Sequence, residues 1–143
     1  MGNRSGIAHA LQGLGLATLE VGDGPTARAL LTECLLRQRE IDDVVWLAPT
    51  LEGLAGAGAR LVREGRGAPA AGARALRLAG AASALREAID QRPSAAERVR
   101  LKRWLRPARR ALPAAAAEAA WRAGLAMSFD QAIDYALGGE VES

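Results

Sequence analysis

The sequence predicts an all-α protein in which helical hairpins stack side by side and a helical tail covers one end of the stack. Half of the 143 residues are hydrophobic but only 3% are aromatic, and alanine is frequent while valine and isoleucine are sparse. This composition favours helices over strands. Breaks that contain glycine and proline divide the chain into segments of helical length, and two of these segments repeat each other.

Residues 5–41 are expected to form the first hairpin. In the first helix, residues 5–21, apolar side chains spaced by three and four residues form a stripe, and Leu16 and Leu19 widen it. The stripe consists of Ile7, Leu11, Leu14, Thr18 and Val21. A glycine cap and an early proline in residues 22–25 separate this helix from the next. The second helix ends near Ile41, and its stripe contains Ala27, Leu30, Leu31, Cys34 and Leu35.

Residues 43–91 are expected to form the second hairpin. Asp42 and Asp43 can cap a third helix that ends near Gly65, and Pro49 either kinks its first turns or marks its true start. A turn over residues 65–69 leads to a fourth helix, which extends to about Gln91. Residues 11–15 match residues 51–55, and residues 27–30 match residues 73–76, so the second hairpin is a longer copy of the first.

Residues 94–137 are expected to form a capping tail of three helices within one domain that spans residues 1–143. Ser94 and Glu97 form a capping box for a helix that runs to about Leu112, and Pro107 should bend this helix. A sixth helix ends at Gly124, and the serine at position 128 caps a short seventh helix. Repeat stacks need such a cap because each repeat buries its apolar face only against a neighbour.

The sequence contains no recognisable catalytic, cofactor or metal motif. His9 is the only histidine and Lys102 the only lysine, so neither a histidine-pair metal site nor a phosphate-binding loop can be built. Two G-x-G-x-x-A matches begin at Gly22 and Gly65, but each joins two helices and is expected to be a turn. We therefore expect no enzyme activity, no cofactor and no bound metal.

Cysteine content and hydropathy predict a cytoplasmic protein without a membrane partner. Cys34 is the only cysteine, which excludes an intramolecular disulfide, and it is expected to be buried on its helix stripe. No apolar run approaches the length of a membrane span. Three tryptophans are expected to be core or repeat-interface anchors, with the first of them open to partial exposure: Trp46, Trp104 and Trp121.

The fifth helix carries seven cations without an acid among them, although the chain as a whole has a net charge of only +3. The cations are Arg98, Arg100, Lys102, Arg103, Arg106, Arg109 and Arg110. They form a solvated face, a phosphate-binding surface for nucleic acid, or a contact for an acidic protein. In the first interpretation, the apolar positions of the same helix are buried: Leu101, Trp104, Leu105, Ala108 and Leu112.

The hairpins resemble degenerate tetratricopeptide repeats, which implies a right-handed stack. Matching residues in the first hairpin are Leu11, Leu14, Gly15, Gly22, Asp23 and Ala27, and in the second Leu51, Leu54, Ala55 and Gly65. A longer resemblance is to the C-terminal helical region of large bacterial ATPase-containing transcriptional regulators of the LuxR and SARP-like types. It is carried by residues 51–55, 78–86, 93–98, 120–128 and 132–133, with departures at Pro113 and Leu125.

These resemblances imply a non-catalytic protein-interaction module in transcription regulation, either the C-terminal part or a short relative of such a regulator. The expected partner is a protein or peptide, including a regulator's ATPase or DNA-binding domain, and a homodimer is an additional expectation. The resemblance to tetratricopeptide inner faces places the partner surface at His9, Gln12, Leu16, Glu20, Glu52 and Arg60. Gln12 and Glu52 would hydrogen-bond the partner backbone.

Two alternatives to this function remain open at this point. One is nucleic-acid binding through the arginine-rich helix 98–110, with contacts from Arg98, Lys102, Arg103, Arg106, Arg109 and Arg110. The other is a scaffold that forms homo-oligomers through an apolar end of the stack.

Overall fold

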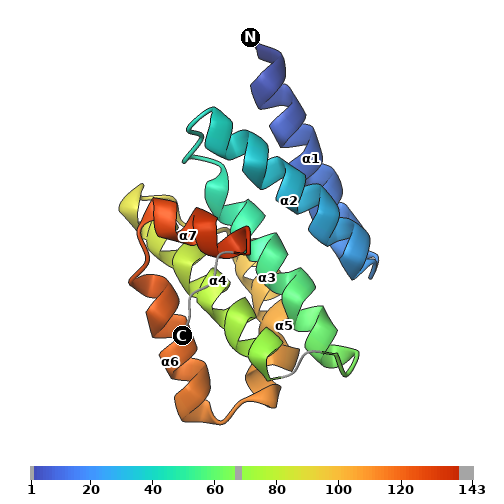
Figure 1. The fold of residues 1–143 in the computed structure, drawn as a ribbon, viewed down its shortest axis with the longest axis vertical. Helices are drawn as coiled ribbons and strands as arrows, with labels where there is room; N and C mark the ends of the chain where they lie inside the picture. The colour runs from blue at the N-terminus through green and yellow to red at the C-terminus, as the bar shows by residue number, and fades with distance from the viewer. Residues whose placement is uncertain (1, 67–68, 139–143) are drawn as a thin grey trace.

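The computed structural model describes residues 2–66 and 69–138, and this part of the chain contains seven α-helices and no strand (Figure 1). The all-α prediction is therefore confirmed. The helices are α1 (Gly2–Glu20), α2 (Gly24–Glu40), α3 (Leu47–Arg63), α4 (Ala70–Ala88), α5 (Ala95–Ala111), α6 (Ala114–Leu125) and α7 (Phe129–Ala136). None of these helices is both long enough and apolar enough to cross a membrane.

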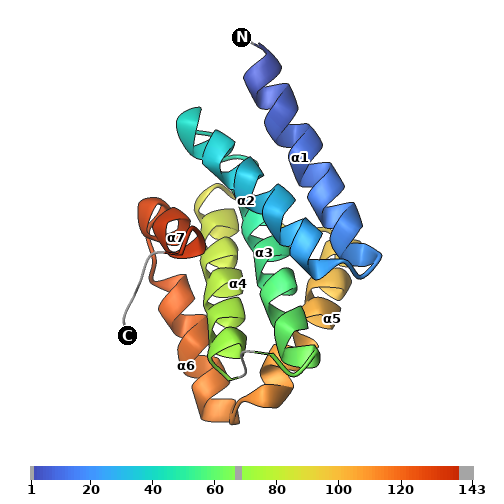
Figure 2. The same ribbon diagram turned by 45° about the vertical axis from the view of Figure 1, so that its right-hand side comes forward.

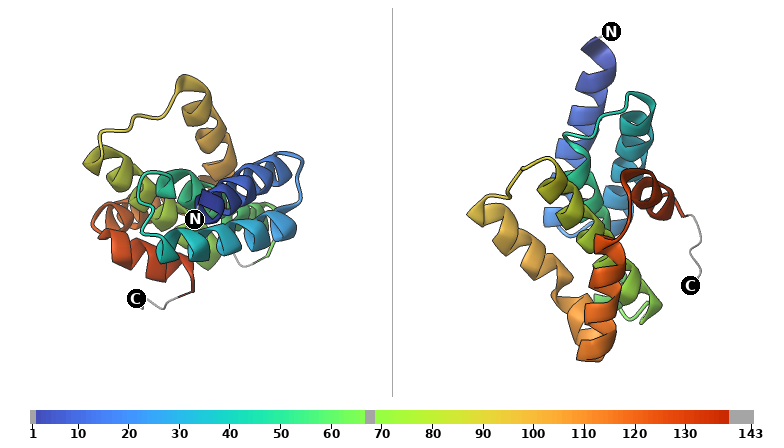
Figure 3. Two further views of the ribbon diagram at one scale, coloured as in Figure 1. Left: turned by 90° about the horizontal axis from the view of Figure 1, so that it is seen from above. Right: turned by 90° about the vertical axis from the view of Figure 1, so that its left-hand side faces the viewer.

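Four helices form two pairs, α1–α2 and α3–α4, and the second pair lies at the centre of the molecule. The α3 helix contacts its partner α4 and also α1, α2 and α5. Helices α6, α4, α3 and α5 lie side by side in that order, with the α1–α2 pair packed against α3 (Figure 2). The connection between α4 and α5 loops outward from the other helices before α5 begins (Figure 3). Because α1, α2, α4 and α5 all pack against it, α3 is enclosed by its neighbours along most of its length.

Both helix pairs end their helices in the same way. The first helix of each pair is followed by a glycine with positive φ, at Gly22 (95°) and Gly65 (76°). The second helix of each pair is followed by an aspartate with positive φ, at Asp42 (53°) and Asp90 (55°). In each case the next amide donates back to a carbonyl five residues earlier, as in a Schellman motif. The repeat found in the sequence is therefore also a repeat of local geometry.

The start of α3 differs in detail from the expected aspartate cap. Asp42 ends α2 instead, and the side chain of Asp43 accepts a hydrogen bond from the Trp46 amide at 3.2 Å, just before α3 begins at Leu47. Pro49 consequently lies in the first turn of α3, where its missing N–H leaves no gap in the helix. Of the two expected roles for Pro49, the start of the helix is the correct one.

The buried face of α1 matches the predicted stripe only in part, because Leu19 of its widened side is buried and three of its central members are not. Ile7, Leu14 and Val21 are 42%, 56% and 82% exposed. The face toward α2 and α3 instead carries Ala8, Gln12, Gly15 and Leu19. A Cβ atom at Gly15 would lie 2.7 Å from the Leu31 side chain, so small residues allow α2 to approach closely. Close packing against α2 therefore uses Ala8 and Gly15 rather than the larger side chains of Ile7 and Leu14.

The core runs from α2 to α7 and is centred on leucines of α2, α3 and α4. Its largest fully buried apolar side chains are Leu31, Leu35, Leu47, Leu51 and Leu76. A second, smaller cluster joins Leu19, Ala27, Ala57 and Trp104, which come from α1, α2, α3 and α5. This second cluster lies beneath the cleft described next.

Candidate interaction cleft

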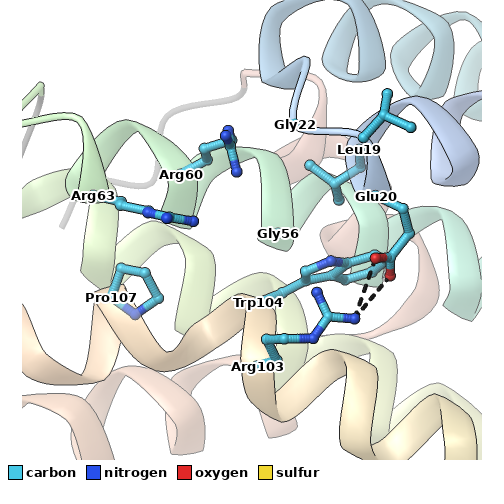
Figure 4. Close-up of a pocket in the computed structure, with 10 residues that line it drawn as sticks. Leu19, Glu20, Gly22, Gly56, Arg60, Arg63, Arg103, Trp104 and Pro107 are labelled. Atoms are coloured by element: carbon cyan, nitrogen blue, oxygen red, sulfur yellow. Dashed lines mark hydrogen bonds and ion pairs between the residues drawn. The ribbon is translucent and has the colours of Figure 1, made fainter.

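A cleft opens between the end of α1, the C-terminal half of α3 and the second half of α5 (Figure 4). It consists of two adjoining hollows of about 300 and 600 Å³ that share Arg63, Arg103 and Pro107. Five arginines line it, namely Arg60, Arg63, Arg103, Arg106 and Arg110. We call it the arginine cleft. Its apolar lining comes from Leu19, Val21, Val62, Trp104, Pro107 and Ala111.

The helices position the arginines in two rows. Arg103, Arg106 and Arg110 are spaced by three and four residues, which places them along one side of α5. Arg60 and Arg63 are in the last turn of α3, beyond its enclosed part, where cations are favoured by the helix dipole. Trp104 is only 8% exposed and packs against Gly56 of α3, where a Cβ would lie 3.0 Å from the indole ring. The two rows therefore flank an apolar floor.

The charge in the arginine cleft is only partly compensated. The Nη2 atom of Arg103 donates to both carboxylate oxygens of Glu20, at 3.2 and 3.1 Å. Arg60 Nε lies 3.4 Å from an oxygen of Glu64. Within residues 2–66 and 69–138, Arg63, Arg106 and Arg110 have no acidic side chain within ion-pair distance. Three guanidinium groups therefore remain available to a bound anion.

Gln12 and Glu52 do not belong to the predicted partner surface, because both are buried. The Gln12 amide donates to the Trp46 carbonyl at 2.7 Å and to the Thr50 hydroxyl at 2.9 Å. Both Glu52 oxygens accept hydrogen bonds from Arg86, at 2.8 and 2.9 Å, and this bonding raises the pKa of Arg86. The hydrogen bonds expected for a partner are thus used inside the molecule, because α3 is enclosed by other helices.

The other predicted partner residues are divided between two places. His9 is exposed, and its ring meets the exposed ring of Trp46 edge-on with centroids 4.5 Å apart. Leu16 is half-buried against the core. Glu20 and Arg60 both line the arginine cleft. Of the six residues, the structure brings these two together at one site.

The cations of the fifth helix do not act as one surface. Arg103, Arg106 and Arg110 face the arginine cleft, whereas Lys102 is exposed outside it. Three further cations have local partners: Arg98 bonds the Pro93 carbonyl at 3.0 Å, and Arg100 and Arg109 stack on Trp104 and Trp121. The prediction of a buried apolar stripe is confirmed for Trp104, Leu105 and Ala108 and holds in part for the half-buried Leu101 and Leu112.

Sequence analysis missed Arg63, which supplies the wall of the arginine cleft opposite α5. The available signal was the pair Arg60 and Arg63, one turn apart at the end of a helix and just before the glycine turn at Gly65. This spacing predicts that the two side chains lie on the same side of their helix. It does not predict the opposite wall of the cleft, which comes from a helix 40 residues further along the chain.

Cys34 is completely buried, as predicted. Its Sγ atom lies 3.3 Å from the Ala8 carbonyl and 3.5 Å from the Thr50 hydroxyl, and burial raises the pKa of the thiol.

The glycine motif at Gly22 is a turn between helices, with Asp23 capping α2. Gly65 also lies in a turn, whereas residues 67 and 68 of the second motif are outside the described residues.

The part of the chain that the structure describes contains no cluster of three or more histidine, cysteine, aspartate or glutamate side chains suited to a metal ion.

The chain matches no protein-family model, and it shows no significant similarity to curated proteins or to solved structures. The functional proposal therefore rests on the geometry of the arginine cleft and on the sequence resemblances.

Proposed function

We propose that this chain is a non-catalytic protein-interaction module and that a protein partner binds in the arginine cleft. The observation that carries the proposal is the arrangement of three uncompensated arginines around a solvent-open, apolar hollow. Arginine is one of the side chains, with tryptophan and tyrosine, that are enriched among the residues dominating binding energy at protein interfaces. Apolar contact with Val62, Pro107 and Ala111 would exclude water, and the guanidinium groups would orient the partner.

We also propose that α1–α2 and α3–α4 are degenerate tetratricopeptide-like repeats in a right-handed stack capped by α5–α7. Support comes from the repeated sequence segments and from the repeated helix ends at Gly22, Gly65, Asp42 and Asp90. The sequence resemblance to LuxR-type and SARP-like regulators supports the proposal that the module works in a bacterial, cytoplasmic transcription-regulatory system. In this setting the partner is another protein or another domain of a regulator.

Affinity capture from a lysate of the host cells tests the proposed function. The bait is the wild-type chain, and the lysate is divided into nuclease-treated and untreated halves. We expect a protein that is retained in both halves and is lost with the bait Arg63→Glu/Arg106→Glu. A matched bait, Arg39→Glu/Lys102→Glu, makes the same charge change at exposed positions outside the cleft and should retain the protein. Retention of no protein, or equal loss with both baits, would contradict the proposal.

Self-association is a second candidate function, and the exposed side chains of Ile7, Leu14 and Val21 favour it. These residues are spaced by seven, or about two helical turns, so they lie on one side of α1 and just beyond its end. The N-terminal part of this helix projects beyond the rest of the molecule (Figure 1). Sedimentation equilibrium of the wild type and of Leu14→Ser tests this candidate. A monomer at all protein concentrations would dismiss it.

A further inference from the structure

The arginine cleft already binds one carboxylate, and this carboxylate comes from the chain itself. Glu20 reaches in from the end of α1, and Arg103 of α5 donates to both of its oxygens (Figure 4). The two side chains are 35% and 53% exposed, so the pair is open to solvent and to exchange with another anion. The geometry thus provides an example of the group that this cleft accepts: a carboxylate held by a guanidinium beside the Trp104 floor.

The remaining arginines of the cleft offer further guanidinium groups that can pair with carboxylates. Arg106 and Arg110 continue the row that begins at Arg103, and the distance from the first to the last is seven residue steps, or roughly 10 Å of helix. Arg63 of α3 lines the same hollow as this row, together with the apolar side chains of Val62 and Ala111. A ligand that fits must therefore combine several anionic groups at helical spacing with an apolar edge.

We infer, on the basis of the proposed function, that the occupant of the arginine cleft is an acidic amphipathic helix of the partner protein. Its carboxylates, spaced three and four residues apart, pair with the row Arg103, Arg106 and Arg110, and Arg63 contacts the same acidic edge from α3. Its apolar edge packs on Val62, Pro107 and Ala111. The partner helix also competes with Glu20 for Arg103, because both offer the same chemical group.

The lining of the cleft favours a protein helix over a nucleic acid. Base recognition in single strands depends on exposed aromatic rings on which bases stack. The one aromatic ring in the cleft, Trp104, is buried, and the guanidinium of Arg100 lies 4.8 Å from its centroid. The apolar floor would contact a sugar–phosphate backbone without any compensating interaction. Aliphatic side chains of a helix fit this floor directly.

Fluorescence anisotropy with a defined peptide tests the inference. The probe is a labelled helical peptide of about 16 residues, with glutamates at positions i, i+3 and i+7 and leucines on the adjacent edge. The control peptide carries glutamine at the same three positions. We expect the full chain to bind the glutamate peptide about tenfold or more tightly than the glutamine peptide, with the difference reduced at high salt.

Matched variants show whether the peptide occupies the cleft. Arg63→Gln/Arg106→Gln should weaken binding about tenfold, and Arg39→Gln/Lys102→Gln should leave binding unchanged although both variants lose the same charge. Glu20→Gln should strengthen binding, because it frees Arg103. Circular dichroism verifies that each variant is folded, and all substituted side chains are at least partly exposed.

Three outcomes would overturn the inference: equal binding of the two peptides, equal loss with both double variants, or displacement of the peptide by a single-stranded oligothymidylate at lower concentration than the unlabelled peptide. The last outcome would assign the cleft to nucleic acid. A captured partner whose binding withstands Arg63→Gln/Arg106→Gln would overturn the acidic helix and leave the interaction module intact. Capture of no partner would instead contradict the proposed function itself.

Discussion

Glu52 of α3 and Arg86 of α4 form a bidentate ion pair inside the molecule, with both side chains 7% exposed. The first helix pair has polar residues at the equivalent positions. Gln12 matches Glu52 in the repeated segment, and Gln38 corresponds to Arg86, since each lies three residues before the isoleucine that caps its helix. Both glutamines donate to the Trp46 carbonyl. The second pair of helices is thus joined directly by a buried ion pair, whereas Gln12 of α1 and Gln38 of α2 meet at a shared carbonyl just before α3.

We expect Arg86→Met to destabilise the protein by about 3–5 kcal/mol, because Glu52 then remains buried without a partner. The double variant Glu52→Gln/Arg86→Met should be less destabilised, since it no longer contains an isolated buried charge. Urea denaturation measures both free energies of unfolding. As a control, Arg122→Met breaks an exposed ion pair with Glu118 and should cost less than about 1 kcal/mol. Equal costs for Arg86→Met and Arg122→Met would contradict the prediction.

The crossing of α4 and α6 depends on two glycines. A Cβ atom at Gly80 would collide with the carbonyl oxygen of Trp121, and one at Gly124 with the carbonyl oxygen of Arg77. Because both obstacles are backbone atoms, the helices must separate to accommodate a methyl group. We expect Gly80→Ala and Gly124→Ala each to lower the free energy of unfolding by about 1–3 kcal/mol. Thermal and urea unfolding would show the loss.

Gly13 is the matched control for these two glycines. It is exposed in the middle of α1, and no atom lies within 4 Å of the position that its Cβ would occupy. Alanine is the better helix former, so Gly13→Ala should stabilise the protein by about 0.5–1 kcal/mol. Destabilisation by Gly13→Ala comparable to that by Gly124→Ala would show that helix crossing is not the cause.

The starts of α5 and α7 followed from local chemistry and could be predicted from the sequence. The Ser94 hydroxyl accepts from the Glu97 amide at 3.1 Å, and the Glu97 carboxylate accepts from the Ser94 amide at 2.8 Å. Ser128 and Gln131 form the same reciprocal pair at the start of α7. Such capping boxes involve residues only three apart, so no tertiary information is needed.

The face of α1 and the arginine cleft depend on contacts between distant segments and could not be predicted in the same way. Leucines occupy several sides of α1, so periodicity alone does not identify the buried side. Glu20 and Arg103 are 83 residues apart, and only the packing of α1, α3 and α5 brings them together. Sequence analysis identified Glu20 and Arg60, and separately the cations of the fifth helix, without the relation between the two groups.

Two leucines of α1 show which side of the helix is buried. Leu19 is 4% exposed and belongs to the cluster with Trp104, whereas Leu14 is 56% exposed. We expect Leu19→Ala to cost about 2–4 kcal/mol, because it leaves a cavity next to Ala57 and Trp104. Leu14→Ala should change the free energy of unfolding by less than about 0.5 kcal/mol. Chemical denaturation of the two variants distinguishes the observed face from the widened stripe expected from the sequence, which contains both leucines and would give similar costs.

The buried thiol of Cys34 makes stability depend on pH in the alkaline range. Burial raises the pKa of Cys34 above its ordinary value of 9.0, although the hydrogen bond with Thr50 acts in the opposite direction. Below that value the thiol keeps its proton in both states, and no pH dependence arises from it. At higher pH the unfolded chain releases a proton that the folded protein retains, so Cys34 lowers stability by up to about 1.4 kcal/mol for each pH unit.

The comparison of the wild type with Cys34→Ala isolates this contribution from other titrating groups. In urea unfolding from pH 7 to pH 10, we expect the wild type to lose stability above about pH 9 more steeply than the variant. The same burial predicts that a thiol-specific reagent modifies Cys34 in the native protein at pH 8 only at the rate of unfolding, and immediately in urea. Identical pH profiles for the two proteins, or rapid native modification, would show that the thiol is reached by solvent and that α2 is not held against Ala8 and Thr50 as the geometry requires.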